Sequence, residues 1–215
     1  MRRSFHESVE EIKGDILKMS SMVEEAVYKS IRALEERKLE LAKRVIEKDD
    51  DIDDYEILLE EKCAGLIALQ QPVARDLRTI MAVSRIATDL ERIGDHAVNI
   101  AEMVLEIGDA PLIKPLIDIP RMTGIVTKRL RECLEAFINH DIELAERTAR
   151  EDEELDILER QIFRELITFM LEDPRTIKQA SLLMFISRFL ERIGDHTTNI
   201  CEGVIYMIKA RRESY

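Results

Sequence analysis

Apolar and small residues recur along the chain at steps that alternate between three and four. In residues 5–37 the series begins Val9, Ile12, Ile16 and Met19. Steps of this kind place side chains on one stripe of an α-helix, as in the seam of a helical bundle. The pattern therefore predicts six long helices and no strands. The other five stretches are residues 42–66, 80–104, 119–137, 145–169 and 180–204.

Proline and glycine mark the points where the apolar pattern is interrupted. Pro72 separates the second stretch from the third, and Pro174 separates the fifth from the sixth. Between the two groups of three, one glycine and two prolines fall close together. We therefore expect an all-α fold of two tandem, pseudo-symmetric three-helix bundles, formed by residues 1–108 and residues 115–215.

The third and sixth stretches contain the same motif. Residues 90–102 read LERIGDHAVNIAE and residues 190–202 read LERIGDHTTNICE, so ten of thirteen positions are identical. This identity indicates an internal duplication. Each copy carries two carboxylates four residues apart, which lie one turn apart on the same helix face. Because like charges at this spacing destabilise an isolated helix, we expect a cation or a basic partner to hold them. The pairs are Glu91 with Asp95, and Glu191 with Asp195.

Acidic residues also repeat in the second and fifth stretches, at an offset of 103 residues. Four of the six occupy seam positions, where leucine or valine is expected. A buried carboxylate costs several kcal/mol unless it is neutralised, paired or bound to a metal. Each half therefore offers two neighbouring helices with carboxylates that converge if the helices pack antiparallel. The acids are Asp49, Asp53 and Glu56 in the first half, and Asp152, Asp156 and Glu159 in the second.

Three interpretations of these acids remain open. They form a solvated acidic edge with local salt bridges, a metal site, or a network of ion pairs clamped by arginines. Carboxylates without cysteine suit hard or borderline cations such as iron, manganese, calcium or magnesium. Asn99 and Asn199 lie one turn beyond Asp95 and Asp195, so they are candidates to support such a site. His96 and His196 point away from the acids by about 100°, so we expect them at the surface.

Charge and composition narrow the function classes. The chain has 44 acidic and 32 basic residues, a net charge of −12, which argues against binding to DNA or RNA. The three single cysteines are typical of reduced, buried thiols in a cytosolic protein. The opening residues turn acidic without an apolar run, so we expect no signal peptide, and no stretch is apolar enough to insert into a membrane.

Motifs for catalysis are not present. A ferritin-like oxidase needs Glu-x-x-His on its bundle helices, whereas Glu91 and His96 are five residues apart. The sequence contains no phosphate-binding loop, no Gly-x-Ser-x-Gly and no His-Glu-x-x-His. We therefore expect a protein that is not an enzyme.

Three stretches of the sequence resemble the PhoU family of phosphate-transport regulators. They are PVARDLR at residues 72–78, DLERIGDHAVNIA at 89–101 and LERIGDHTTNI at 190–200. The resemblance covers the whole chain, with both halves in the same order. The second half lacks a clean copy of PVARDLR, which leaves a binding role for that segment less supported than one for the repeated acids. The segment contributes three candidate binding residues, Arg75, Asp76 and Arg78.

The resemblance implies a duplicated three-helix fold and a cytoplasmic, non-enzymatic negative regulator of the phosphate regulon. Its implied partners are the ATPase of the phosphate ABC transporter and the phosphate sensor histidine kinase, and a homodimer is also expected. Some members carry multinuclear metal clusters, with iron as the first expectation and zinc, manganese, calcium or magnesium as alternatives. The alternative function is a carboxylate-bridged metal-binding or metal-storage bundle with oxidase activity. The matching acids are Asp49, Asp53, Glu91, Asp95, Asp152, Asp156, Glu191 and Asp195.

Overall fold

A computed structural model describes the backbone of residues 2–151 and 153–210, and the side chains of these residues other than 2–4 and 6. All regular structure within these ranges is helical, which confirms the predicted all-α fold. The elements are α1 (Arg2–Glu36), α2 (Leu39–Glu47), α3 (Asp49–Gln70), α4 (Arg75–Ile107), α5 (Asp118–Asn139), α6 (Ile142–Arg150), α7 (Glu153–Glu172), the short 3₁₀ helix η1 (Pro174–Thr176) and α8 (Ile177–Lys209).

The second and fifth predicted helices are each divided in two. The first division falls at Lys48, which separates α2 from α3. Three aspartates then occupy the first turn of α3. The N-terminus of a helix carries partial positive charge, so this division places the acids where the helix dipole stabilises them. The second division falls between Arg150 and Glu153 and separates α6 from α7, whose first turn is also acidic.

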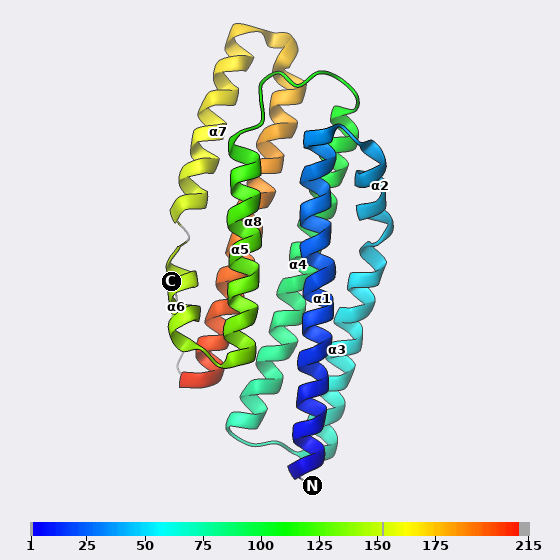
Figure 1. Cartoon of the computed structure of the whole chain (residues 1–215), viewed down its shortest axis with the longest axis vertical. Coiled ribbons are helices and arrows are strands. Elements are labelled where there is room, and N and C mark those ends of the chain that lie inside the picture. The colour runs from blue at the N-terminus through cyan, green and yellow to red at the C-terminus, as the bar shows by residue number, and fades with distance from the viewer. Residues whose placement is uncertain (1, 152, 211–215) are drawn as a thin grey trace.

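The two halves pack against each other along their last helices (Figure 1). α4 and α8 run antiparallel through the centre of the molecule, and they contact each other more extensively than any other pair of helices. α1 and α5 also meet across the halves, while α3 and α7 lie on opposite sides (Figure 1). The buried side chains of both halves form one continuous core. The two predicted bundles are therefore joined into a single packed body.

Gly94 on α4 explains how closely α3 approaches. A Cβ atom at this position would lie 3.2 Å from Cδ1 of Ile52 and 3.3 Å from its Cγ2. Ile52 is itself buried. The glycine inside the repeated motif therefore serves close helix packing, which brings the acids of α3 next to those of α4.

The halves correspond residue by residue. α1 and α5 both end in a left-handed residue, Arg37 with φ of 53° and His140 with φ of 54°. These positions are 103 residues apart, and the same offset relates α2 and α3 to α6 and α7. α4 and α8 are related by the offset of 100 in the repeated motif. Any position in one half can therefore be compared with its counterpart in the other.

Candidate functional site

The acids of the first half come together between α3 and α4. The pKa of Asp49 is raised to about 6, first by burial and then by the neighbouring charges of Asp53 and Asp95. The pKa of Asp53 is raised by burial and then by Asp95. Carboxylates from the two helices therefore repel one another through space, as the sequence pattern anticipates.

Glu91 on α4 is largely enclosed by its neighbours. Its side chain is 13% exposed, and burial followed by the charge of Asp95 raises its pKa to about 7. Glu56, half-buried on α3, also raises it. Arg92 ion-pairs with Asp95 at 2.8 Å and lies 3.2 Å from Oε2 of Glu91. Neither this Oε2 nor the buried Oδ1 of Asp53 has a hydrogen-bond partner among the described residues.

These carboxylates are chemically suited to a hard cation. Oxygen ligands from several acids are the set that calcium, magnesium, manganese and iron accept. Buried oxygens without hydrogen bonds, on acids whose pKa values are raised by one another, fit a site where added positive charge is favourable. Among the described residues, however, no three His, Cys, Asp or Glu side chains are arranged to hold a metal ion. Coordination would therefore require these side chains to rotate toward a common point.

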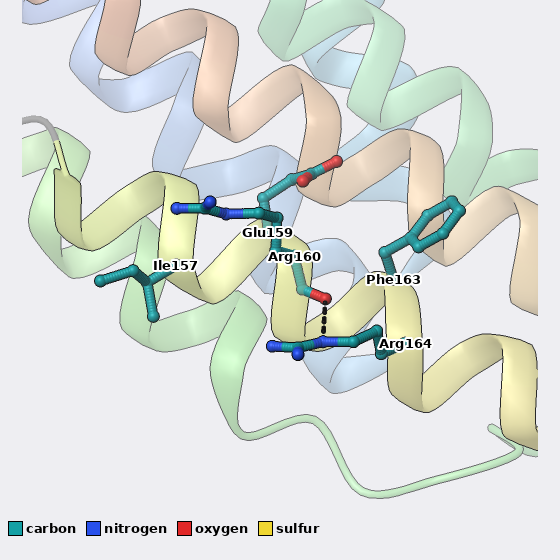
Figure 2. A pocket seen from close by; sticks show the side chains of 5 residues that line it. All are labelled: Ile157, Glu159, Arg160, Phe163 and Arg164. Carbon is teal, nitrogen blue, oxygen red and sulfur yellow. Dashed lines mark hydrogen bonds between the residues drawn. The ribbon is translucent and has the colours of Figure 1, made fainter.

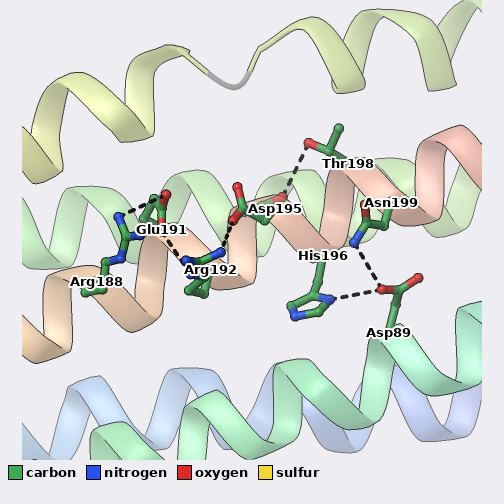
Figure 3. Close-up of polar contacts among 9 residues, drawn as sticks. Asp89, Arg188, Glu191, Arg192, Asp195, His196, Thr198 and Asn199 are labelled. Atoms are coloured by element: carbon green, nitrogen blue, oxygen red, sulfur yellow. Dashed lines mark hydrogen bonds and ion pairs between the residues drawn. The ribbon is translucent and has the colours of Figure 1, made fainter. Parts of the chain in front are cut away.

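The second half presents the same acids with more arginines around them. Glu191 is also 13% exposed, and its pKa is raised by burial and by Asp195 but lowered by Arg188 and Arg192. Arg192 ion-pairs with Asp195 at 3.2 Å, and Arg188 lies 3.4 Å from Oε1 of Glu191 (Figure 3). Oε2 of Glu191 has no hydrogen-bond partner among the described residues. Asp156 is exposed in the first turn of α7.

Asp152, the counterpart of Asp49, lies outside the described residues. The predicted convergence of the second set of acids can therefore be followed only for Asp156, Glu191 and Asp195. Glu191 is reached by the charge of Asp156 from α7, so these two helices do bring acids together.

Arg129 on α5 is a buried charged residue near the contact with α8 that the sequence pattern did not reveal. It is fully buried, and its Nη2 donates a hydrogen bond of 2.6 Å to Oγ1 of Thr198 on α8. The sequence did carry a signal for its burial, because Arg129 stands three residues after Val126 and so falls on the apolar face of its helix. A charged residue at such a position is unusual unless it is paired.

The two histidines are not surface residues, so that expectation is wrong. His96 stacks on Phe189 with ring centroids 5.7 Å apart, and its ring lies 5.6 Å from that of His196. His196 forms a hydrogen bond of 2.9 Å through Nδ1 with Oδ1 of Asp89 (Figure 3). Burial lowers the pKa of His96 to about 4. Both rings point into the contact between α4 and α8, which sequence spacing within one helix could not reveal.

The remaining candidates lie around these sites. Asn199 is exposed and its Nδ2 is 3.4 Å from Oδ1 of Asp89, so it faces the contact between the halves (Figure 3). Asn99 is half-buried on α4. Arg75 and Asp76 are exposed at the start of α4, where they line a hollow of about 290 Å³. Arg78 donates a hydrogen bond of 3.4 Å from Nε to the carbonyl of Met207 near the end of α8.

A larger hollow of about 590 Å³ lies along α7 (Figure 2). Its lining residues come from successive turns of that one helix, and Arg164 donates a 3.2 Å hydrogen bond to the carbonyl of Arg160. Glu159 is the one candidate acid that lines it. A hollow of this kind does not enclose a small molecule. Its lining residues are Ile157, Glu159, Arg160, Phe163 and Arg164.

The fold and the two sets of acids define a class of protein: a duplicated three-helix bundle with repeated carboxylate motifs on the helices of each half. No described helix combines the length and apolar character needed to cross a membrane. The sequence matches the PhoU domain twice, over residues 16–104 and 119–204. The chain belongs to the PhoU family.

Relatives of known name span nearly the whole chain. It is 43% identical over 199 residues to the phosphate-specific transport system accessory protein PhoU homolog of Aquifex aeolicus, covering 93% of this chain and 90% of that protein. It is 38% identical over 212 residues to the homolog from Clostridium acetobutylicum, covering 98% and 97%. The crystal structure of PhoU from Pseudomonas aeruginosa superposes with a TM-score of 0.92 at 35% identity, covering 96% of this chain and all of that one.

Proposed function

We propose that this chain is a non-enzymatic accessory protein of a phosphate-specific transport system and a negative regulator of the phosphate regulon. The observation that carries the proposal is the match over both repeats to relatives named as accessory proteins of that system. In this role the chain works in the cytoplasm as an adaptor. Its partners are the ATPase of the phosphate ABC transporter and the phosphate sensor histidine kinase, and a second copy of the chain is a further proposed partner.

The proposal includes a metal on the acids of each half. In the second half the proposed ligands are Asp152, Asp156, Glu191 and Asp195. In the first half the metal would lie between α3 and α4. Asp49 and Asp53 from α3, with Glu91 and Asp95 from α4, would hold it, with Glu56 adjacent. Support comes from the raised pKa values of Asp49, Asp53 and Glu91. The buried oxygens of Asp53 and Glu91 that lack hydrogen bonds among the described residues add to it. Iron is the first candidate, and zinc, manganese, calcium or magnesium are the alternatives. When bound, the cation would offset the repulsion between the carboxylates and tie α3 to α4.

The residues do not favour catalysis by such a metal. The carboxylates lie on helices without the Glu-x-x-His motif of di-iron oxidases. The larger hollow on α7 is separate from the acids of the first half. An oxidase or storage function therefore has no observation in its favour beyond the acids themselves.

Deletion of the gene in its host tests the regulatory role. We expect phosphate-scavenging genes to be expressed in phosphate-rich medium, and repression to return when the intact gene is restored. Pull-down of the transporter ATPase and the sensor kinase by the tagged chain tests the adaptor role. Normal repression in the deletion strain would contradict the proposal.

A further inference from the structure

The hollow at the start of α4 lies between elements of both halves. It measures about 290 Å³ and is lined by the N-terminal part of α1, the start of α4 and the corner between α5 and α6. These three segments meet at one end of the molecule (Figure 1). The proposed function assigns no ligand to this hollow. Its lining residues are Phe5, Val9, Glu10, Lys13, Arg75, Asp76, Thr79 and His140.

Three of the lining side chains are basic, and they lie close enough to affect one another. The side chain of Lys13 is only 11% exposed, and its ammonium ion-pairs at 2.9 Å with Glu10, whose side chain is 69% exposed. Burial, followed by the charges of Lys13 and Arg75, lowers the pKa of His140, while Glu10 raises it. Basic groups from three separate segments of the chain therefore share one electrostatic environment.

Two of these basic groups lack a partner in the part of the chain that the structure describes. Nδ1 of His140 is buried there without a hydrogen bond, which is unfavourable unless a ligand or water supplies one. Arg75 forms no ion pair with any described residue. Its counterpart by the offset of 100, Arg175, ion-pairs with Asp173 at 2.8 Å, and the first half has Val73 in place of that aspartate. The guanidinium of Arg75 is therefore available to a ligand.

The corresponding place at the start of α8 is closed by the segment that joins the two halves. Gln179, the counterpart of Thr79, accepts a 2.6 Å hydrogen bond from the backbone N–H of Ile113. The same side chain donates a 3.1 Å hydrogen bond to the carbonyl of Pro111. By the offset of 103, the two charged residues that α1 contributes to the hollow correspond to the apolar Ile113 and Leu116. The chain thus satisfies its own polar groups in the second half, whereas it leaves a charged hollow in the first.

The lining of the hollow presents acceptors as well as donors. Lys13, Arg75 and His140 offer N–H groups, and guanidinium and ammonium groups bind oxyanions through charge-assisted hydrogen bonds. Glu10 and Asp76 offer carboxylate oxygens, which repel an oxyanion that carries no proton. Inorganic phosphate at neutral pH keeps at least one proton. Its bare oxygens can therefore accept from the basic groups while its hydroxyl donates to a carboxylate.

We propose that this hollow binds inorganic phosphate, with Lys13, Arg75 and His140 donating to its oxygens and Asp76 accepting from its hydroxyl. Lys13 then shares its ammonium between the phosphate and the exposed Glu10. The ligand contacts α1 and α4 of the first half and the α5–α6 corner of the second. Binding therefore stabilises the contact between the halves according to the phosphate concentration relative to its Kd. The site is separate from the acids of the proposed metal sites and does not depend on them.

Equilibrium dialysis of the full chain against radiolabelled phosphate tests the site. EDTA is present throughout, so that phosphate cannot bind through a metal, and ionic strength is held constant. We expect saturable binding by the unaltered chain. Arg75→Gln should weaken it by at least about tenfold, which corresponds to the loss of one charge-assisted hydrogen bond. Arg175→Gln is the matched control, because it changes the exposed arginine at the corresponding place in the other half, and it should leave the affinity unchanged.

Competing anions at pH 7.5 identify the ligand. Unlabelled phosphate should displace the label fully, and sulfate, which has no hydroxyl, should displace it poorly. Phosphoserine represents a phosphoryl group on a larger molecule. It should also compete poorly, because its second proton is lost with a pKa of about 6. Asp76→Asn should narrow the difference between phosphate and sulfate, since it removes the charge that repels the fully ionised anion. Arg75 and Asp76 are both exposed, so neither change disturbs the core.

Three results would overturn the inference. The first is a chain that shows no saturable binding of phosphate. The second is an affinity that Arg75→Gln leaves unchanged, which would place any bound phosphate elsewhere. The third is displacement by sulfate or phosphoserine that equals displacement by phosphate, which would reject inorganic phosphate as the specific ligand. None of these results bears on the regulatory role, which is tested separately by the gene deletion.

Discussion

The two halves of the molecule share a backbone plan and a nearly identical acidic motif, yet they surround the glutamate of that motif with different basic residues. In the first half, Arg92 opposes the charge of Glu91, whose pKa is nevertheless raised to about 7. In the second, Glu191 is opposed by Arg188 and Arg192, and its pKa is raised less strongly. The difference comes from residues outside the acidic pair itself. A repeated motif therefore specifies where the charges lie, while its surroundings decide what holds them.

The helices that pack behind the motif differ more than the motif does. α4 and α8 match at ten of thirteen positions in the repeat, but α1 and α5 place alanine and arginine at equivalent points of their apolar series. Arg129 is fully buried against α8, whereas Ala26 leaves a hollow. Change at the supporting helix thus gives the two copies of the motif different surroundings.

The largest effect is expected from removing the buried arginine. Arg129→Ala deletes a fully buried guanidinium and leaves Oγ1 of Thr198 without its donor. Leaving a buried hydroxyl without its hydrogen-bond partner costs about 1–3 kcal/mol, and the cavity left by the buried side chain adds to that loss. Arg131, two residues further along α5, is exposed and ion-pairs with Glu24 on α1. Arg131→Ala is the control, and we expect it to cost about 1 kcal/mol or less.

Urea unfolding followed by circular dichroism measures both changes in EDTA. Equal costs for the two arginines would show that burial of Arg129 contributes little, and the contrast between the halves would lose its main support. The slope of the transition should stay the same in both variants if the native fold is retained.

The sequence alone predicted the helices, but it did not predict the different surroundings of the acids in the two halves. The spacing of apolar residues and the positions of the prolines located six helical stretches. This was possible because the apolar stripe of a helix can be recognised from the residues of that helix alone. The division at Lys48 was missed because the apolar series continues through it, while the run of aspartates after it favours a new helix N-terminus.

Contacts between the halves were beyond sequence reasoning. His96 was expected at the surface because its neighbours on α4 suggested nothing else, yet Phe189 and His196 of α8 cover it. The partner of Arg129 is 69 residues away on α8. Spacing along one helix predicts which residues share a face, but it does not predict which helix faces them. The convergence of Asp49 with Asp95 was predictable because both belong to neighbouring helices of one bundle.

The next effect concerns pH in the absence of metal. The folded pKa values of Asp49 and Glu91 are raised to about 6 and about 7, above their ordinary values. The folded state therefore binds more protons than the unfolded state between about pH 4 and pH 7. Stability should fall as pH rises through this window, by a total on the order of 2 kcal/mol, because solvent screens these partly exposed carboxylates and reduces the full effect of their shifts.

Urea midpoints in EDTA at pH 5 and pH 7.5 measure this slope. Asp49→Asn with Glu91→Gln should flatten it, and Glu191→Gln should flatten it less, because arginines already offset that acid. Added Mn²⁺ should reverse the trend, since a metal competes with protons for the same oxygens. An identical slope in all variants would show that neither set of acids is under electrostatic strain.

A smaller effect is expected where α3 meets the repeated motif. Gly94→Ala would place its Cβ 3.2 Å from Cδ1 of Ile52. Overpacking costs about 1–3 kcal/mol and alanine returns up to about 1 kcal/mol of helix propensity, so we expect a net loss of about 1 kcal/mol. Adding Ile52→Val to Gly94→Ala removes the clashing Cδ1 methyl and should restore part of the lost stability. Gly124 on α5 has open space around it, and Gly124→Ala should be neutral or stabilising.

The smallest effect is expected at the contact between α4 and α8, where the halves differ once more. Oδ1 of Asp89 lies 2.9 Å from Nδ1 of His196 and 3.4 Å from Nδ2 of Asn199, within hydrogen-bonding distance of both. The counterpart of Asp89 in the second half is Phe189, which stacks on His96 instead. Asp89→Asn keeps an acceptor for the histidine, so it should change the free energy of unfolding by less than about 1 kcal/mol.

Asn199→Ala should cost about 0.5 kcal/mol or less, because its contact with Asp89 is long and its side chain is exposed. Urea unfolding at pH 7.5 measures both changes. Asp89→Phe is the informative third variant, because it makes the two ends of the contact alike while leaving His196 without its carboxylate. We expect it to cost more than Asp89→Asn, since the buried side of the imidazole then loses its hydrogen bond. If Asp89→Phe is instead as stable as the unaltered chain, stacking alone is sufficient at both ends, and the polar contact of the second histidine is dispensable for the packing of the two halves.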